Sequence, residues 1–279
     1  MNEASTLGES DTVLFARAGA VATLTLNRPK AGNAINLELA RALMERAIVC
    51  DEDESIRCVV LTGAGRMFCA GGDVTDFATA GEGTGALFKN LTAYLHMAVS
   101  RLARMRKPLL TAINGPAAGA GLSLAILGDL ALAARSAHFT VAYPAIGLSP
   151  DGASTWLLPR LVGLRRAQEL MLLNKRVGAD EAAAMGLITR CVEEAQLLRE
   201  ATSLADELAA AATGALGRTR QLLVESFSHS LETQMENESR AIAEASASAH
   251  GREGIRAFCE KRKPVFGANG TFNVLRGAT

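Results

Sequence analysis

Residues 109–134 read LLTAINGPAAGAGLSLAILGDLALAA, and this stretch carries the pattern that decides the fold. LLTAI (109–113) is expected to be a strand, and NGPAAGAGLSLAILGD after it a turn that feeds a helix. LALAARSAHFTVA then predicts one or two further strands. The stretch is also the most membrane-like part of the chain, but Pro116, Asp129 and several glycines interrupt it, so no bilayer span is expected. We therefore expect buried strands around a helix of small residues.

Outward from this stretch, strands and helices alternate on the N-terminal side, and the C-terminal side is helical. TVLFARAG and VATLTLNRP predict a hairpin around Gly19, and Asn36 is placed to cap the helix that follows. CVVLTG (58–63) is a short β-branched run that ends in glycine, as a buried parallel strand does. A helix is expected over about 84–107, ending before a proline. From about 151 onward the pattern is helical, and it is punctuated by three glycines, Gly163, Gly178 and Gly186.

This order of elements predicts an α/β fold. Its first half indicates helices stacked on sheet layers through right-handed crossovers. Its helical second half suggests a lid or an oligomerisation arm.

Composition narrows the function classes. The chain has 279 residues, of which 49% are hydrophobic and 21% charged, and 29 basic residues balance 29 acidic ones. Nothing global therefore attracts nucleic acid or a membrane surface. The five cysteines form no C-x-x-C pair, which favours reduced thiols and a cytoplasmic location. The start, MNEASTLGESD, is polar and acidic and does not read as a signal peptide, and no metal-ligand spacing is present.

Two loops of small residues follow two of the predicted strands. Cys69–Asp73 follows CVVLTG, and Ala118–Gly121 follows LLTAI and opens a helix. Sites in α/β sheets gather at the carboxyl ends of strands, and small residues let backbone N–H groups approach a ligand. Two such amides that converge on a carbonyl oxygen would stabilise a developing enolate or tetrahedral anion. The alternative is that the small residues serve close packing alone.

Four motifs bear on this choice. MFCAGGDVTDF and INGPAAGAGLSLAILGDLALAARSAHF closely resemble the enoyl-CoA hydratase/isomerase family, also called the crotonase family. NRPKAGNAIN and FCEKRKPVF match it too, so the resemblance covers the chain from about Val13 to Phe266. It implies the crotonase (ClpP-like) ββα spiral and CoA-thioester substrates. By motif position, it implies that the amides of Gly72 and Ala120 are the oxyanion donors.

The resemblance also implies how the chain is organised. A crotonase core with the CoA-thioester site is expected over 12–195, and a helical trimerisation or lid region over 196–266. Residues 1–11 and 267–279 are expected to be flexible tails. The expected partners are an acyl-CoA thioester and further copies of the chain, in a homotrimer or a hexamer of two trimers, with no nucleic acid and no membrane. Coenzyme A is part of the substrate, so no separate cofactor is expected.

The side chains that would do the chemistry differ from those of hydratases. Hydratases of this family use two glutamates, whose positions fall here on Ser123 and Tyr143, and neither is a carboxylate. The remaining carboxylate candidate is Asp151 in IGLSPDGASTWLLPRLVG. This region resembles ring-1,2-epoxyphenylacetyl-CoA isomerases and 4-chlorobenzoyl-CoA dehalogenases, in which an aspartate at this position acts. The alternative is that Asp151 caps the helix that follows.

His96 is the second open question. It lies beside an apolar helical stripe, so a packing histidine is one interpretation. The dehalogenases also have a histidine that matches His96 and activates water. Two departures from them stand out: the tryptophan that orients their aspartate is Tyr143 here, and their aromatic residue at the first oxyanion position is Gly72. Tyr143 is expected to donate a hydrogen bond to Asp151.

Binding of the CoA portion is expected from the matched motifs. Arg28, Lys30 and Arg66 are candidates to meet the pyrophosphate or the 3′-phosphate, although each could equally be a solvated surface charge. Phe258 and Lys261 match family positions that contact the CoA of a neighbouring subunit. Backbone atoms near the adenine and pantetheine are expected from three further residues, Ala31, Ala70 and Asp73.

The sequence therefore predicts an enzyme that acts on an acyl-CoA thioester through an enolate, with double-bond isomerisation by Asp151 as the first hypothesis. Hydration of a 2-enoyl-CoA is an alternative. A further alternative is aryl-CoA dehalogenation, with Asp151 as the nucleophile and His96 as the base. A hypothesis of another class is a non-catalytic scaffold that binds CoA esters or associates with RNA.

Overall fold

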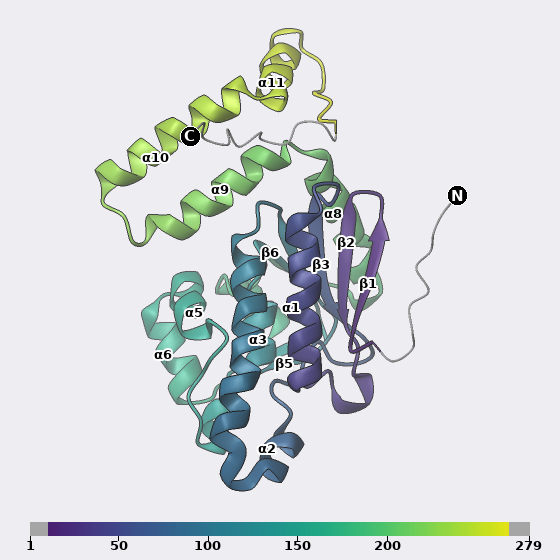
Figure 1. The fold of residues 1–279 in the computed structure, drawn as a ribbon, viewed down its shortest axis with the longest axis vertical. Helices are drawn as coiled ribbons and strands as arrows, with labels where there is room; N and C mark the ends of the chain where they lie inside the picture. Colours follow the sequence, from purple (N-terminus) through teal and green to yellow (C-terminus); the bar gives the residue numbers. More distant parts are fainter. Residues whose placement is uncertain (1–10, 268–279) are drawn as a thin grey trace, which may run out of the picture.

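The structure is a computed structural model, and it describes residues 11–267. Apart from Asp11 and Gly267, the predicted tails lie outside the described residues. A central sheet organises the rest (Figure 1). In spatial order its six strands are β1 (Val13–Ala18), β2 (Val21–Leu26), β3 (Cys58–Gly63), β4 (Leu109–Ile113), β6 (Leu130–Ala134) and β9 (Arg190–Val192).

The hairpin around Gly19 is confirmed: β1 and β2 pair antiparallel, and every other neighbouring pair in this sheet is parallel. A smaller sheet is added beside it. It contains β5 (Ala117–Ala118), β7 (His138–Thr140) and β8 (Val177–Gly178). The predicted strands 58–63 and 109–113 are confirmed as β3 and β4. LALAARSAHFTVA, where one or two strands were expected, contains two, β6 and β7.

The two faces of the central sheet are covered by different helices, because side chains alternate along a strand. On β3, Val59 and Leu61 belong to the core shared with α1 (Leu37–Glu52) and α3 (Thr84–Arg104). Cys58 and Val60 point to the other face, where α8 (Leu197–Ala210) packs. The core therefore has two layers, one on each side of the sheet.

Helix ends follow local chemistry. The Asn36 side chain accepts a hydrogen bond from Leu39 N at 2.9 Å, which confirms it as the N-cap of α1. The long helix α3 ends at Arg104, earlier than the predicted residue 107, because Met105 leaves the helical conformation and buries its side chain. Arg220 N–H groups donate to carbonyls at this end, including that of Leu102 at 3.0 Å. A side chain from a distant helix thus satisfies carbonyls that have no partner within α3.

The prediction that the chain is helical from 151 onward is only partly correct. The region contains α5 (Ser154–Val162), α6 (Leu164–Leu172), α7 (Ala179–Ala184) and α8, but also β8 and β9. These strands are two and three residues long, too short to give a recognisable pattern, and neighbouring strands hold them in place. Gly163 caps the end of α5, as expected.

The last helices form an arm beyond one end of the sheet (Figure 1). They are α9 (Thr213–Ser226), α10 (Leu231–Ala247) and α11 (Ala249–Cys259). The remaining helices are short: α2 (Val74–Ala80), α4 (Ala120–Ala125) and the 3-10 helices η1 (Pro29–Ala31), η2 (Gly81–Gly83), η3 (Tyr143–Ile146) and η4 (Glu194–Gln196). Within residues 11–267, no helix combines the length and apolarity needed to cross a membrane.

Candidate active site

The two small-residue loops meet backbone to backbone. Cys69 forms a parallel bridge with Ala117, and Ala118 N donates to Cys69 O at 2.9 Å. Glycine is required on both sides of this contact. A Cβ at Gly71, whose φ is +99°, would lie 2.9 Å from Ala118 O, and one at Gly121 would lie 2.2 Å from Cys69 O. The two loops therefore approach more closely than side chains would allow.

The contact brings two amides to one cavity. Gly72 and Ala120 both line a cavity of about 230 Å³. Neither backbone N–H donates to another residue within the described part of the chain. Gly119, with φ 54° and ψ −128°, precedes α4 and sets the direction of the Ala120 N–H. Two unpaired donors in one cavity are the arrangement that an oxyanion requires.

Asp151 lines the same cavity, and its carboxylate has a partner at each oxygen. The Tyr143 hydroxyl donates a short hydrogen bond to Oδ1, and His96 Nε2 lies 3.3 Å from Oδ2. The Asp151 backbone is held as well, because its carbonyl accepts from the Ser123 hydroxyl at 3.0 Å and from the Ser154 hydroxyl at 2.9 Å. The carboxylate is thus fixed in position relative to the two amides.

The alternative role of Asp151, as a helix cap, is wrong. Helix α5 begins at Ser154, its N-cap is Ala153, and no side chain caps it. The Asp151 carboxylate faces Tyr143 and His96 instead. Its side chain is 27% exposed, so substrate and solvent can both reach it.

Tyr143 is placed to donate rather than to accept. Burial, together with the negative charge of Asp151 and the hydrogen bond to it, raises the pKa of Tyr143 far above its usual range. The phenol therefore stays protonated at any working pH. It stands at the start of η3, where the hydratase pattern places a glutamate.

Ser123, at the other glutamate position, is completely buried. Gly152, with φ +62°, packs on it so closely that a Cβ there would lie 3.0 Å from the Ser123 Cβ. The serine is one turn along α4 from Ala120, so a single helix carries one oxyanion amide and the anchor of the Asp151 loop. A glutamate at 123 would have no room in this packing.

His96 has two possible hydrogen-bond partners at the same nitrogen. Its Nε2 accepts from Gly152 N at 3.3 Å when that nitrogen is unprotonated. When Nε2 carries the proton, it donates to Asp151 Oδ2 instead. The ring is half exposed and does not line the cavity of the two amides. It reaches that cavity only through Asp151.

The charged residues predicted to bind CoA have different surroundings in the structure: two pair with each other, and two are exposed. Arg28 donates to Asp73 at 2.9 Å, and Asp73 also caps α2 by accepting from Thr75 N at 3.2 Å. Burial alone would raise the pKa of Asp73, but the hydrogen bond and charge of Arg28, together with backbone hydrogen bonds from Thr75 and Asp76, outweigh it and hold that pKa below its usual range. Both side chains are therefore occupied within the protein. Lys30 and Arg66 are exposed to solvent.

Ala31 and Ala70 lie on neighbouring loops near these charges. Gly32, next to Ala31, accepts a hydrogen bond from Ala70 N at 2.9 Å, and Ala70 lines the cavity. Phe258 is 85% exposed on α11, and neither it nor Lys261 lines the cavity. Their expected contact with a neighbouring subunit's CoA stays a prediction.

Sequence reasoning did not identify the aromatic wall of the cavity. Phe77 and Phe88 line it with their ring centroids 4.3 Å apart. A Cβ at Gly72 would lie 2.6 Å from the Phe77 ring, so Phe77 fills the space beside the first oxyanion position. Two phenylalanines in an otherwise polar segment after the first loop were the available signal.

The comparisons with known proteins agree with this geometry. Residues 16–269 match the enoyl-CoA hydratase/isomerase family model. The chain belongs to this family. A 1,2-epoxyphenylacetyl-CoA isomerase of Escherichia coli strain K12 is 42% identical over 247 residues, which are 88% of this chain and 94% of the isomerase. A 4-chlorobenzoyl coenzyme A dehalogenase of an Arthrobacter species is 36% identical over 243 residues, 86% of this chain and 88% of the dehalogenase.

Solved structures confirm the crotonase fold that the motifs predicted. A putative enoyl-CoA hydratase from Streptomyces coelicolor A3(2) superposes with a TM-score of 0.88 and 31% identity, covering 96% of this chain and 98% of the other. The protein is therefore an enzyme of the enoyl-CoA hydratase/isomerase family that acts on acyl-CoA. Members with isomerase, hydratase and dehalogenase names all match, so the family alone does not select the reaction.

Proposed function

We propose that this enzyme moves a carbon–carbon double bond within an acyl-CoA thioester. One observation carries the proposal: Asp151 is the only acidic residue among those lining the cavity of the Gly72 and Ala120 amides, within the described chain. A 1,3-proton shift needs a single base that takes a proton and returns it elsewhere. Hydration by the two-glutamate route needs a second carboxylate, and the described residues around this cavity include none.

The reaction would proceed through an enolate. The thioester oxygen accepts hydrogen bonds from the Gly72 and Ala120 amides, which stabilise the negative charge as it develops; each such donor contributes about 10²–10³ in rate. Asp151 removes a proton from the α or γ carbon of the acyl group. The same carboxyl returns this proton at the other end of the rearranged system, so the substrate neither gains nor loses atoms.

The surrounding groups suit this cycle. Tyr143 holds Oδ1 of Asp151 and keeps the carboxylate from rotating. While Gly152 donates to His96 Nε2, Oδ2 receives no hydrogen bond from the histidine and is available for the substrate proton. No cofactor is needed, since coenzyme A arrives with the substrate, and we propose that the exposed Lys30 and Arg66 meet its phosphates.

The test is Asp151→Asn, because asparagine keeps the shape and still accepts the Tyr143 hydrogen bond. We expect turnover to be abolished while CoA-ester binding persists. Asp206→Asn on the exposed surface of α8 is the control and should leave turnover unchanged. A screen of straight-chain and aryl CoA thioesters would supply the substrate. Liquid chromatography precedes the mass-spectrometric readout, because an isomerised product has the same mass as its substrate. Unchanged turnover in Asp151→Asn would remove the basis of the proposal.

Aryl-CoA dehalogenation is the second candidate, and the 3.3 Å separation of His96 Nε2 and Asp151 Oδ2 favours it. In that reaction Asp151 displaces the halide as a nucleophile, and His96 activates the water that releases the product. Turnover in ¹⁸O-labelled water separates the possibilities. Isomerisation incorporates no oxygen, and hydration adds labelled oxygen. In a single dehalogenase turnover, the product hydroxyl oxygen comes from the Asp151 carboxylate.

We also propose a homotrimer, or a hexamer of two trimers, in the cytoplasm. Large apolar side chains exposed on the arm support the assembly, among them Leu231, Ile242 and Phe258. Reduced thiols support the location, because all five cysteines are free. Light scattering on the purified protein would test the assembly, and a monomer would contradict it.

A further inference from the structure

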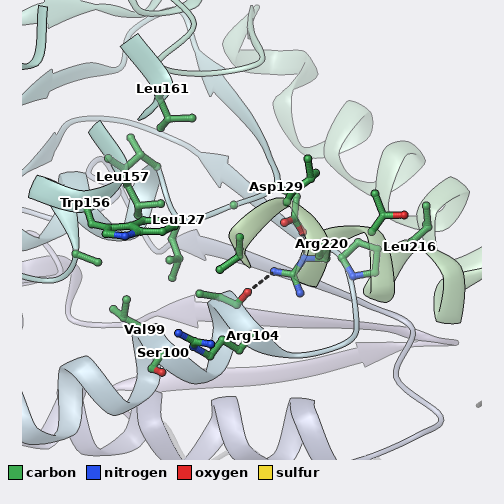
Figure 2. Close-up of a pocket in the computed structure, with 18 of the residues that line it drawn as sticks. Val99, Ser100, Arg104, Leu127, Asp129, Trp156, Leu157, Leu161, Leu216 and Arg220 are labelled. Atoms are coloured by element: carbon green, nitrogen blue, oxygen red, sulfur yellow. Dashed lines mark hydrogen bonds and ion pairs between the residues drawn. The ribbon is translucent and has the colours of Figure 1, made fainter. Parts of the chain in front are cut away.

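A second cavity, of about 710 Å³, lies between the arm and the core. Figure 2 shows its walls: Trp156, Leu157 and Leu161 of α5 on one side, Leu216 and Arg220 of α9 on the other, and Val99, Ser100 and Arg104 of α3 below. Small-molecule sites usually occupy about 300–1,000 Å³. This cavity falls in that range, whereas the 230 Å³ around the two amides does not.

The lining selects an apolar occupant. Most of the residues in the lining are apolar, and more than half of these apolar residues come from α3, α5 and α9 (Figure 2). The one buried charged side chain, Arg220, is 8% exposed and already neutralised. It pairs with Asp129 at 2.6 Å and donates to the carbonyl of Lys107 at 2.6 Å. Arg104, at the α3 side, is exposed to solvent. Arg220 therefore offers no unpaired charge to a polar ligand.

The two cavities share a wall at the catalytic carboxylate. His96 lines the large cavity, Asp151 lines the small one, and their side chains are 3.3 Å apart. At two places along the chain, residues that are close in sequence line different cavities. Leu95 lines the small cavity and its neighbour His96 the large one, and Asp151 lines the small cavity while Ala153 lines the large one.

We propose that the large cavity binds the distal part of the substrate's acyl group, and that the enzyme accordingly acts on CoA thioesters whose hydrocarbon part extends beyond the small cavity. The proposal rests on the proposed function. The thioester and the reacting carbons occupy the small cavity, and the rest of the chain passes the half-exposed His96 ring into the apolar space behind it.

The experiment measures binding rather than turnover. Saturated acyl-CoA thioesters from butanoyl to hexadecanoyl have no double bond to move, so their dissociation constants can be measured by calorimetry on the full-length protein. Each methylene that enters the cavity should tighten binding by about three- to fourfold. We expect this gain to continue over successive methylenes and then to level off where the cavity is full.

Two matched variants on α3 locate the effect. Ser100→Trp places a large ring into the cavity from an exposed position, whereas Ala93→Trp makes a similar change on the same helix at a residue that lines neither cavity. Ser100→Trp should remove the gain for long chains and leave butanoyl-CoA affinity unchanged. Ala93→Trp should leave the whole series unchanged.

Other outcomes overturn the proposal in distinguishable ways. Affinity that does not depend on chain length, or a gain that survives Ser100→Trp, would show that the acyl group lies elsewhere. If Ser100→Trp instead changes the mass measured by light scattering and leaves the chain-length series intact, the cavity belongs to a contact with a second copy. If no thioester of any length binds, the proposed function fails as well.

Discussion

Gly119→Ala tests whether the direction of one backbone amide sets the rate. Gly119 has φ 54° and ψ −128°, a conformation that side-chain-bearing residues rarely adopt, and the next peptide carries the Ala120 N–H. A Cβ at this position would meet no clash, since the nearest atom is Gly71 Cα at 3.5 Å. The cost of the substitution is therefore backbone strain, on the order of 1–3 kcal/mol. Relaxing this strain rotates the peptide and turns the Ala120 amide away from the cavity.

The chain contains a matched control. Gly81, at the end of α2, has φ 52° and ψ −126°, nearly the same as Gly119, and nothing lies within 4 Å of a Cβ there. It lines neither of the two cavities around the Asp151 region. Gly81→Ala should therefore lose the same stability, about 2–4 °C in Tm for each kcal/mol in a chain of this size. Only Gly119→Ala should also lose about 10²–10³ in kcat, the usual value of one oxyanion donor.

The assay pairs thermal unfolding with turnover of the CoA thioester found in the substrate screen. Infrared difference spectra of a bound ¹³C-labelled thioester give an independent reading, because an oxyanion hole polarises the carbonyl and lowers its stretching frequency. We expect this shift to weaken in Gly119→Ala and to persist in Gly81→Ala. If the two variants show equal kcat and equal carbonyl shifts, the Ala120 amide does not stabilise the enolate and the reasoning is refuted.

Three further predictions concern two side chains beside Asp151 and the cysteines. Tyr143→Phe removes the hydrogen-bond donor to Asp151. Because hydrogen bonds to charged groups are worth about 1.5–3 kcal/mol, kcat/KM should fall by about ten- to a hundredfold. An unchanged kcat/KM in steady-state kinetics would contradict the positioning role of Tyr143. Ser123→Ala should lower kcat more than it changes KM, since it removes one of the two hydroxyl donors to the Asp151 carbonyl without touching the amides, and steady-state kinetics check this. Ser123→Glu should not create a hydratase, which an assay in ¹⁸O-labelled water checks. Exposed Cys259 should react with a thiol reagent in the native protein. Burial raises the pKa of three other thiols to about 12, so these should react only after the protein unfolds. Absorbance kinetics with and without denaturant would follow both reactions. The three buried thiols are Cys50, Cys58 and Cys69.

The sequence predicted helices and strands correctly where the local pattern is strong. The β-branched run CVVLTG predicted β3, LLTAI predicted β4, Asn36 predicted the start of α1, and Gly19 predicted the hairpin. Strand β9 was missed because its three residues carry no pattern of their own, and the neighbouring strand β6 determines their conformation. The end of α3 was misplaced for a similar reason, since a distant arginine helps to cap it.

By itself the sequence determined the fold class, the family motifs and the two small-residue loops, because these depend on residues that are neighbours along the chain. Only the tertiary structure decided where the Asp151 carboxylate points. The sequence allowed a helix cap, whereas the folded chain directs the carboxylate to Tyr143 and to His96, which is 55 residues away. The tertiary structure also pairs Arg28 with Asp73 in an ion pair. Such partners are chosen by the packing of distant segments, and residue type and spacing do not encode that packing locally.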